Sequence, residues 1–185
     1  KNIFILFLIG LFSCNKIGEK NESWDRLFDG KTLTGWYVIG GNAKYEVRDG
    51  IIVGTSVLNT LNTFLCSDKF YDDFILEIES KIDSNMNSGI QIRSNSIDSY
   101  KHGKVHGYQI EIDPSERAWS GGIYDEGRRG WLYSLNENPE AQKAFKKNKW
   151  NSYRIEAIGD TIKTWINDVP AAYLIDDMTH IGFIG

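Results

Sequence analysis

Apolar and polar residues alternate along most of the chain from Trp24 onward. In the stretch "DFILEIESKI", for example, Phe74, Leu76 and Ile78 fall on one face of an extended chain, and acidic residues fall on the other. A period of two residues in short segments separated by Gly, Asn and Asp is typical of half-buried β-strands joined by tight turns. Two sheets packed on their apolar faces bury such strands, so the pattern predicts an all-β sandwich of two antiparallel sheets.

Turn residues locate several hairpins within this pattern. "KYEVRDGIIVG" predicts a reversal at Asp49-Gly50, and "YRIEAIGDTIKTWINDVPAAYLI" predicts two more, at Gly159-Asp160 and Asn167-Asp168. "NPEAQKAFKK" predicts one short helix. No internal repeat or second domain is evident, so we expect a single sandwich domain over residues 24–185.

The N-terminal segment has a different character. Residues 1–13, "KNIFILFLIGLFS", form a basic start and an apolar run, which predicts a secretion signal. The following Cys14 completes "LFSC", which resembles a bacterial lipobox, so we expect cleavage before a lipidated Cys14 and a flexible tether over residues 14–23. This predicts a protein lipid-anchored in the bacterial envelope, on the periplasmic side or the outer-membrane surface. A plain signal peptide with a chance cysteine remains an alternative, and Cys66 is expected to be a small core residue.

Charge and motif spacing exclude several function classes. The 185 residues carry 21 Lys and Arg against 25 Asp and Glu, and the basic residues form no stripe, so a nucleic-acid partner is not expected. No GxGxxG opens a helix, no GxSxG is present, and the three histidines lack metal-ligand spacing. We therefore expect neither a metal nor another cofactor, and membrane contact only through the lipid anchor.

Two neighbouring strand patterns place polar side chains on one face. In "SGIQIRSN" and "GYQIEID" the isoleucines point one way, and the polar residues point the other. The polar set is Gln91, Arg93, Gln109, Glu111 and Asp113. Amides, guanidinium groups and carboxylates pair well with sugar hydroxyls, although cross-strand ion pairing on a solvated face is the alternative.

The next segment, "SGGIYDEGRRGWLY", supplies aromatic rings and further charges. Tyr124 and Trp131 could stack on pyranose rings, and Asp125 and Arg128 could bind a hydroxylated or anionic ligand, unless they only form surface ion pairs. His106 precedes the second polar strand and could shuttle protons near neutral pH, unless it is simply a loop histidine.

Taken in order, "LFDGKTLTGWYV", "YEVRDGIIVGTS", "NSGIQIRS", "HGYQIEID", "GGIYDEG" and "WNSYRIEAIGDTIKTWINDVP" resemble the 3-keto-disaccharide hydrolase family. The resemblance implies a concanavalin A-like jelly roll with a concave carbohydrate site, in proteins commonly secreted or lipid-anchored by Bacteroidetes. It implies that Gln91, Arg93, Gln109 and Glu111 lie on the concave sheet, and that His106, Tyr124, Asp125 and Arg128 lie on loops at its rim. It also leads us to expect a further strand after "IGFIG", which this sequence lacks.

The chemistry that the resemblance implies is cleavage of 3-keto-glycosides. A ketone at C3 acidifies the C2 proton, so a base can abstract it and the C1 substituent can leave by elimination, after which water adds. We expect Glu111 to be the base, with His106 second, and Arg93 or Arg128 to stabilise the oxyanion. Protonated His106 or Asp125 would assist the leaving oxygen. The expected substrate-binding residues are Gln91, Gln109, Asp113, Tyr124, Arg128 and Trp131.

Two alternatives stay open. Direct glycoside hydrolysis could use Glu111 with Asp113 or Asp125 as a carboxylate pair. A non-catalytic carbohydrate-binding lipoprotein could use the same amides and aromatic rings.

Overall fold

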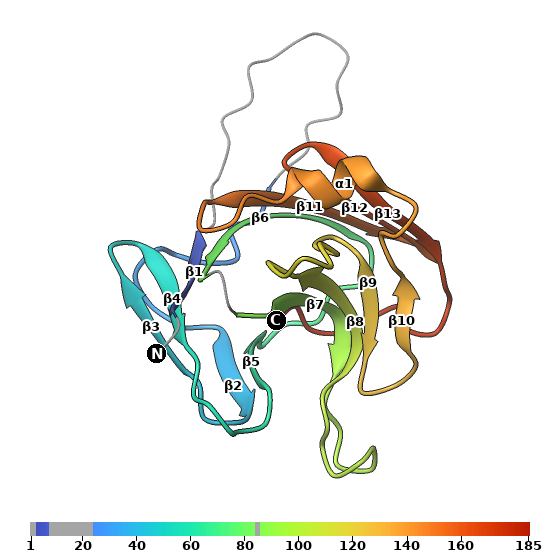
Figure 1. The fold of residues 1–185 in the computed structure, drawn as a ribbon. Helices are drawn as coiled ribbons and strands as arrows, with labels where there is room; N and C mark the ends of the chain where they lie inside the picture. Colours follow the sequence, from blue (N-terminus) through green and yellow to red (C-terminus); the bar gives the residue numbers. More distant parts are fainter. Residues whose placement is uncertain (1–2, 8–23, 84–85) are drawn as a thin grey trace, which may run out of the picture.

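A computed structural model describes residues 3–7, 24–83 and 86–185. The described chain consists of thirteen strands and one short helix arranged in facing layers (Figure 1). The elements are β1 (Ile3–Phe7), β2 (Trp36–Gly40), β3 (Lys44–Arg48), β4 (Ile51–Thr55), β5 (Thr63–Ser67), β6 (Phe74–Ile82), β7 (Ser88–Asn95), β8 (His106–Ile112), β9 (Ile123–Glu126), β10 (Gly130–Tyr133), α1 (Pro139–Ala144), β11 (Asn151–Ile158), β12 (Thr161–Ile166) and β13 (Val169–Ile175).

The first layer is a seven-stranded antiparallel sheet in the order β13-β12-β11-β6-β1-β4-β3. The second contains the sheets β10-β9-β8-β7 and β2-β5. Residues 182–185 connect these two: the Gly185 carbonyl accepts from the Gln91 amide of β7 at 2.7 Å, and the Ile184 carbonyl accepts from the Ser67 amide of β5 at 2.8 Å. The predicted all-β sandwich is therefore confirmed.

The main core lies between the long sheet and the β7–β10 sheet. The four isoleucines of β7 and β8 are at most 2% exposed and pack in one cluster with residues of β6 and β11. These are Ile90, Ile92, Ile110 and Ile112. The predicted burial of these isoleucines is thus confirmed, and each contributes roughly 1.5–3 kcal/mol of transfer free energy.

The turns also follow the sequence prediction. β3 and β4 are joined at Asp49 and Gly50, both with positive φ (50° and 78°), as a two-residue hairpin of this hand requires. Asn167 and Asp168 have positive φ between β12 and β13 in the same way. The predicted helix forms as α1, where the Asn138 side chain caps the first turn by accepting from the Ala141 amide at 3.1 Å.

β1 forms from residues that the sequence predicts to be part of a signal peptide. It lies between β4 and β6 and pairs with both in antiparallel register. Cleavage before Cys14 would remove it, and β4 and β6 would then lack this neighbour. Cys14 and the whole of the expected tether, residues 14–23, lie outside the described residues. No helix among the described residues is long and apolar enough to cross a membrane.

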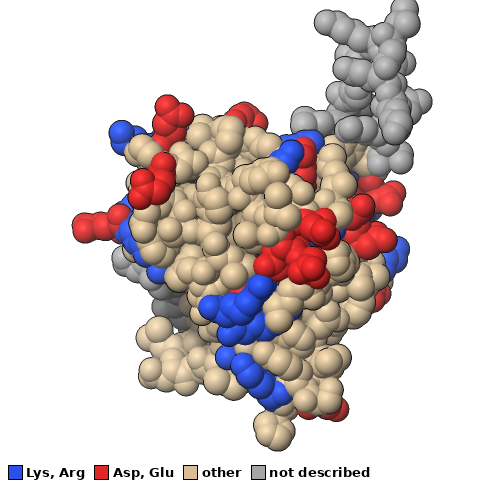
Figure 2. All heavy atoms as spheres, turned by 90° about the vertical axis from the view of Figure 1, so that its right-hand side faces the viewer, with Lys and Arg blue, Asp and Glu red and all other residues tan. Residues whose placement is uncertain are grey.

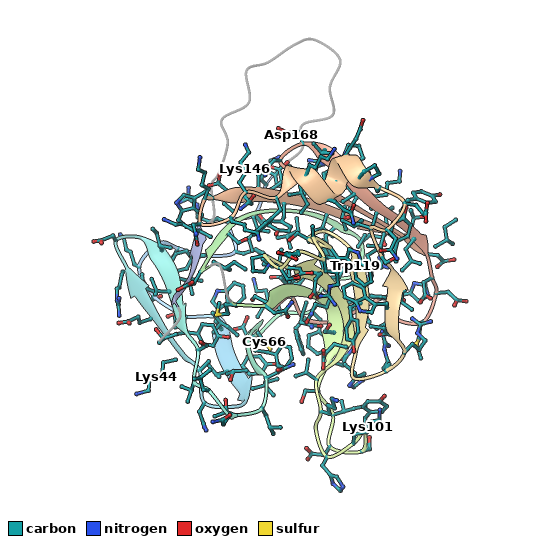
Figure 3. All side chains as sticks on the ribbon, in the orientation of Figure 1. Lys44, Cys66, Lys101, Trp119, Lys146 and Asp168 are labelled. Atoms are coloured by element: carbon teal, nitrogen blue, oxygen red, sulfur yellow. The ribbon has the colours of Figure 1, made fainter. Side chains whose placement is uncertain are left out.

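Two further expectations concern single side chains and overall charge. Cys66 is fully buried between β2 and the chain end, and burial raises the pKa of its thiol to about 12, so it is a core residue as expected (Figure 3). On the face shown in Figure 2, a group of basic side chains lies directly below a group of acidic ones.

Candidate functional site

A row of polar and aromatic side chains crosses the outer face of the β7–β10 sheet. The strand register places Gln91 opposite Gln109, Gln109 opposite Tyr124, and Tyr124 opposite Trp131. Residues directly opposite in antiparallel strands share a face, so these four residues form one line across the sheet. Glu111 lies on the same face one step along β8, opposite Gly89.

Hydrogen bonds tie the first part of this row together. Gln91 Nε2 donates to Gln109 Oε1 at 2.7 Å, and Gln109 Nε2 donates to Glu111 Oε2 at 3.0 Å. Gly89 makes room for this arrangement, because a Cβ there would lie 2.4 Å from the Gln109 Cγ. The predicted positions of Gln91, Gln109 and Glu111 on one face are therefore correct.

The Glu111 carboxylate is 3% exposed and lies beneath more exposed polar side chains. Asn87 Nδ2 donates to its Oε1 at 2.6 Å, and Arg117 Nη2 approaches the same oxygen at 3.3 Å. Burial raises the pKa of Glu111 above its usual value, although hydrogen bonds from Asn87 and Gln109 and the charge of Arg117 act in the opposite direction. A buried carboxylate with a raised pKa is suited to accept a proton.

Arg117 connects Glu111 to the second carboxylate of the strand. Its Nε donates to Asp113 Oδ2 at 2.7 Å, and the Ser115 amide donates to Asp113 Oδ1 at 3.0 Å. Burial alone would raise the pKa of Asp113, but these hydrogen bonds and the Arg117 charge together lower it. The two carboxylates thus have pKa shifts of opposite direction.

Aromatic rings surround the Arg117 guanidinium. Its Cζ lies 4.8 Å from the centroid of Trp119 and 4.8 Å from that of Trp131. The two indoles meet edge to face at 4.7 Å, and Tyr124 packs against Trp131 at 5.3 Å. Cation–π contacts hold the arginine in place without using its N–H donors. Figure 3 shows Trp119 near the middle of the molecule, beside β9 and β10.

The prediction was wrong for Arg93. The register between β7 and β8 shifts after Ile92, and Arg93 adopts a positive φ of 46°, which turns its side chain out of the polar row. The guanidinium is fully buried, where it donates to the carbonyls of Asp72 and Gly159 and to the Asp73 carboxylate at 2.7–3.0 Å. Arg93 therefore links loops and does not face the site.

The side chains of Asp125 and Arg128 do not face the polar row either. Asp125 belongs to β9, not to a rim loop, and alternation along the strand turns it away from the side chain of Tyr124. It is fully buried and paired with Arg128 at 2.6 Å and with Arg129. Arg128 also donates to Thr179 Oγ1 at 2.5 Å. These residues form a structural ion-pair network on the other face of the sheet.

His106 is separated from Glu111 along the same strand. Five residues at the rise of an extended strand correspond to about 17 Å, which is too far for both to act on one bond. The His106 ring packs against Tyr100 at 4.1 Å, and its Nδ1 lies 2.9 Å from the Lys104 carbonyl. The structure does not bring His106 to the candidate site.

Sequence reasoning did not identify Asn87 and Arg117. Asn87 directly precedes β7, and Arg117 lies in the loop between β8 and β9. That loop is held at its base, because Glu111 and Gly122 share a backbone hydrogen bond of 2.9 Å, as do Gly121 and Glu111. Residues in loops carry no periodicity, so no pattern in the sequence indicated that Arg117 reaches Glu111. In the described parts of the chain, no cluster of three or more His, Cys, Asp or Glu residues is arranged to hold a metal ion.

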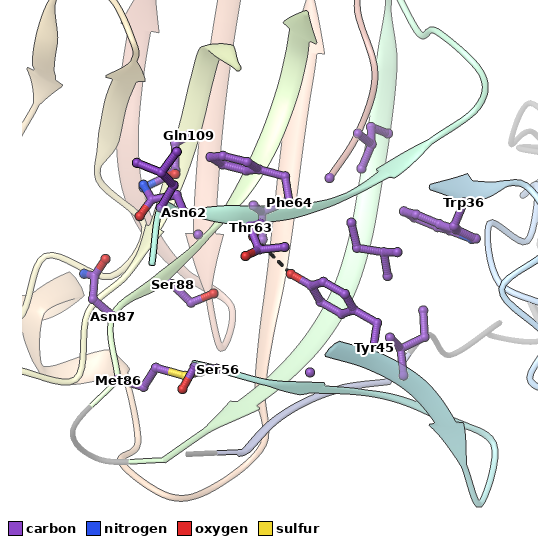
Figure 4. A pocket seen from close by; sticks show the side chains of 18 of the residues that line it. Trp36, Tyr45, Ser56, Asn62, Thr63, Phe64, Met86, Asn87, Ser88 and Gln109 are labelled. Atoms are coloured by element: carbon purple, nitrogen blue, oxygen red, sulfur yellow. Dashed lines mark hydrogen bonds between the residues drawn. The ribbon is translucent and has the colours of Figure 1, made fainter. Parts of the chain in front are cut away.

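A cavity of about 280 Å³ adjoins the row at Asn87 and Gln109 (Figure 4). Its polar end contains these two amides and Asn62, and its other end is lined by apolar and aromatic side chains such as Trp36 and Tyr45. Two partners of Glu111 therefore line a cavity that a ligand could reach.

Comparison with solved structures confirms the fold. A carbohydrate-binding module of family 66 from Bacillus subtilis is 20% identical, with a TM-score of 0.61 over 82% of this chain and 85% of that chain. A candidate glycosyl hydrolase from Parabacteroides distasonis is 17% identical, with a TM-score of 0.61 over 92% of this chain and 89% of that chain. No curated protein matches the chain.

The sequence resemblance is confirmed by a family model that matches almost the whole described domain. The match runs over residues 23–185, which include every residue of the polar row and of the Arg117 loop. The chain belongs to the family described as the 3-keto-alpha-glucoside-1,2-lyase-like domain.

Proposed function

We propose that this protein binds a 3-keto-glycoside on the outer face of β7–β10 and cleaves it by elimination, with Glu111 as the base. The observation that carries the proposal is the buried Glu111 carboxylate, whose pKa is raised by burial and whose oxygens are held by Asn87 and Gln109. The lyase named in the family description supports elimination as the reaction type.

The proposed reaction begins when a Glu111 oxygen removes the proton from C2. The electron pair of the C2–H bond moves to the C3 ketone and forms an enolate. The C1–O bond then breaks, the leaving oxygen takes a proton, and an enone with a C1–C2 double bond remains. Water adds to C1 while C2 regains a proton, which completes cleavage of the glycoside.

Arg117 replaces Arg93 and Arg128 as the proposed stabiliser of the enolate oxygen. Its 3.3 Å contact with Glu111 is the longest of the contacts to that carboxylate, and its side chain is 40% exposed. A ligand oxygen can therefore attract Nη2 away from Glu111 at low cost, which also frees the Glu111 oxygen to accept a proton. A preorganised cation aimed at a developing oxyanion typically contributes several kcal/mol to catalysis.

The remaining residues of the row are proposed to bind the sugar. Gln91 and Gln109 present amides, and the partly exposed rings of Tyr124 and Trp131 offer apolar surface against which a pyranose can stack. Asp113 would hold Arg117 in place. Binding without chemistry would use the same contacts, so the decisive test concerns Glu111.

The first prediction is that Glu111→Gln lowers the turnover of a 3-keto-glycoside by about 10²-fold or more, because glutamine cannot accept the proton. Substrate affinity should be retained, since the Gln109 and Asn87 side chains remain. Sugar release and calorimetric binding should be measured on the same preparations. Glu77→Gln is the matched control, because Glu77 pairs with Arg154 on the far sheet. Glycan binding by the wild type without any turnover would instead identify a binding module.

A further inference from the structure

The polar row continues beyond Gln91 to a buried serine near the end of β7. Ser94 Oγ lies 2.7 Å from Gln91 Oε1 and 3.0 Å from the Ile92 carbonyl oxygen, and both of these atoms can only accept. The Ser94 hydroxyl therefore donates to Gln91. Together with the bonds from Gln91 to Gln109 and from Gln109 to Glu111, this contact makes one chain of three hydrogen bonds that ends on the carboxylate.

The chemistry of the two ends fixes the direction of this chain. The ionised Glu111 carboxylate can only accept, so Gln109 has to turn its amide nitrogen toward Glu111 and its amide oxygen toward Gln91. Gln91 then has to present its nitrogen to Gln109 and its oxygen to Ser94. Only a donor can complete the chain at that point. The Ser94 hydroxyl supplies this donor, so every group in the chain is matched.

A bulge in β7 places Ser94 on this face of the sheet. The register between β7 and β8 shifts after Ile92, so Arg93 and Ser94 stand opposite the single residue Gly107. Simple alternation would place Ser94 on the core side with Ile92, but the positive φ of Arg93 resets the alternation and Ser94 meets Gln91 instead. Gly107 leaves the necessary space, because a Cβ there would overlap the Ser94 side chain. The irregularity that removes Arg93 from the polar row thus adds Ser94 to it.

The Ser94 end of the chain is shielded from solvent. Ser94 is fully buried, and Gln91 is 1% exposed. Phe183 exchanges backbone hydrogen bonds with Ser94, so its ring shares this face, where it packs with Val105 and Cys66. Because solvent does not reach this end, loss of the serine hydroxyl would leave the buried Gln91 oxygen without a donor.

We propose that Ser94 is a positioning residue for Glu111: its hydroxyl fixes the direction of the amide chain and so keeps a donor on Glu111 Oε2. Without that hydroxyl, either Gln91 keeps its direction with an unmatched oxygen, or both amides turn over and the Gln109 oxygen meets the carboxylate. Both outcomes weaken the donor at Glu111, and the aligned hydrogen bonds also lose their mutual polarisation. The role in catalysis rests on the proposed function, since only there does Glu111 act as the base.

Loss of this donor should change the pKa of Glu111 in a defined direction. Burial raises this pKa, and the Gln109 hydrogen bond is one of the contacts that oppose the shift. A weaker bond should therefore raise the pKa further, and the base would be protonated over a wider acidic range. The charged and titratable groups that face Glu111 are Arg117, Asp113 and Tyr153. In the described part of the chain, neither Ser94 nor Gln91 is hydrogen-bonded to any of them, so the change reaches Glu111 through the amides.

The test titrates the Glu111 carboxyl carbon by NMR in protein with isotope-labelled glutamate, and it measures turnover of a 3-keto-glycoside across pH. The variants are Ser94→Ala, Gln91→Met and the double variant. Gln91→Met removes the link between Ser94 and Gln109 and keeps a side chain of similar length. Ser80→Ala is the matched control, because Ser80 on β6 is equally buried and its hydroxyl has no hydrogen-bond partner among the described residues.

We expect Ser94→Ala to raise the pKa of Glu111. Turnover on the acidic side of that pKa should fall by about threefold or more and recover at higher pH, with little change in KM. Gln91→Met should move the titration in the same direction, and the double variant should move it no further than Gln91→Met alone. Ser80→Ala should titrate like the wild type.

An unchanged Glu111 titration in Ser94→Ala would overturn the proposal, as would additive shifts in the double variant or an equal shift in Ser80→Ala. If Ser94→Ala does not fold, the Gln91→Met titration decides in its place. The titration needs no substrate, so its failure and that of the proposed function are distinguishable. A shifted titration in Ser94→Ala, with no sugar release by the wild type, would support the amide chain and contradict the proposed function.

Discussion

At the scale of single residues, Glu111 and Asp113 show how the surroundings shift the pKa values of two carboxylates in opposite directions, although the residues lie only two positions apart in the sequence. Both are at most 3% exposed. Asp113 accepts from Arg117 Nε and the Ser115 amide, and its pKa is lowered, whereas burial dominates at Glu111 and its pKa is raised. A pair of carboxylates with opposite shifts is a common arrangement for acid–base chemistry.

The second prediction follows from the raised pKa of Glu111. A carboxyl whose folded-state pKa exceeds its unfolded value of about 4.5 stabilises the fold when protonated, and this contribution is lost as pH rises through the folded-state pKa. Glu111→Gln mimics the protonated form. The melting temperature of the variant minus that of the wild type should therefore increase with pH above 4.5. A difference that is constant from pH 4 to pH 7 would show that burial does not dominate at Glu111.

The third prediction distinguishes Arg93, which the sequence argument placed at the site, from Arg117, which we propose in its place. Arg117→Gln should lower turnover by about 10²-fold, because the proposed oxyanion contact is lost, and it should also destabilise the fold, because the buried Asp113 carboxylate loses the Nε donor. Arg93→Met should destabilise the protein by about 3 kcal/mol, because the Asp72 and Gly159 carbonyls lose charged donors, while the folded fraction stays active. Turnover and denaturant unfolding of both variants measure this. Loss of turnover in folded Arg93→Met, with turnover retained in Arg117→Gln, would contradict this prediction and place Arg93 at the site.

At the scale of strands and loops, the predictions held where periodicity is strong. Ile90 and Ile110 are buried as the alternation requires, and Gln91 and Gln109 meet on the opposite face. Arg93 does not follow the predicted alternation, because an irregularity in β7 shifts the register after Ile92, and a single sequence does not indicate such a shift. Arg117 was not predicted at all, because its position depends on the course of a loop.

Asp125 and His106 show two other limits of the sequence argument. Asp125 lies within a strand where the family resemblance implied a loop at the rim, and its side chain points away from the row. His106 is close to Glu111 in sequence, but an extended strand separates five positions by about 17 Å. Proximity in sequence means proximity in space only along a helix or a tight turn.

The fourth prediction concerns β1 and the proposed lipid anchor. If residues 1–13 are a signal peptide, labelling with a fatty-acid probe should be lost in Cys14→Ala, and the mature protein should begin at residue 14 and lack β1. Cys66→Ala is the control, because that buried thiol is not expected to carry lipid. Labelling that persists in Cys14→Ala, or a mature protein that retains residues 3–7, would contradict the proposed anchor.

At the scale of the whole molecule, the architecture explains why one face carries the site. The long sheet covers the core side of β7–β10 (Figure 1), so the polar row lies on the opposite face of these strands, where we propose that the ligand binds. The fold alone does not determine activity, because similar sandwiches serve both binding and catalysis. Whether this protein cleaves a sugar or only binds it therefore has to be tested by measuring the reaction itself.

The most direct test compares sugar release from a 3-keto-glycoside and from its unoxidised parent under identical conditions. Elimination requires an acidified C2 proton, so we predict release from the keto sugar at least about 10²-fold faster than from the parent. Equal rates would contradict elimination and favour direct hydrolysis by the Glu111 and Asp113 pair. Release from neither, with both sugars bound, would contradict catalysis altogether.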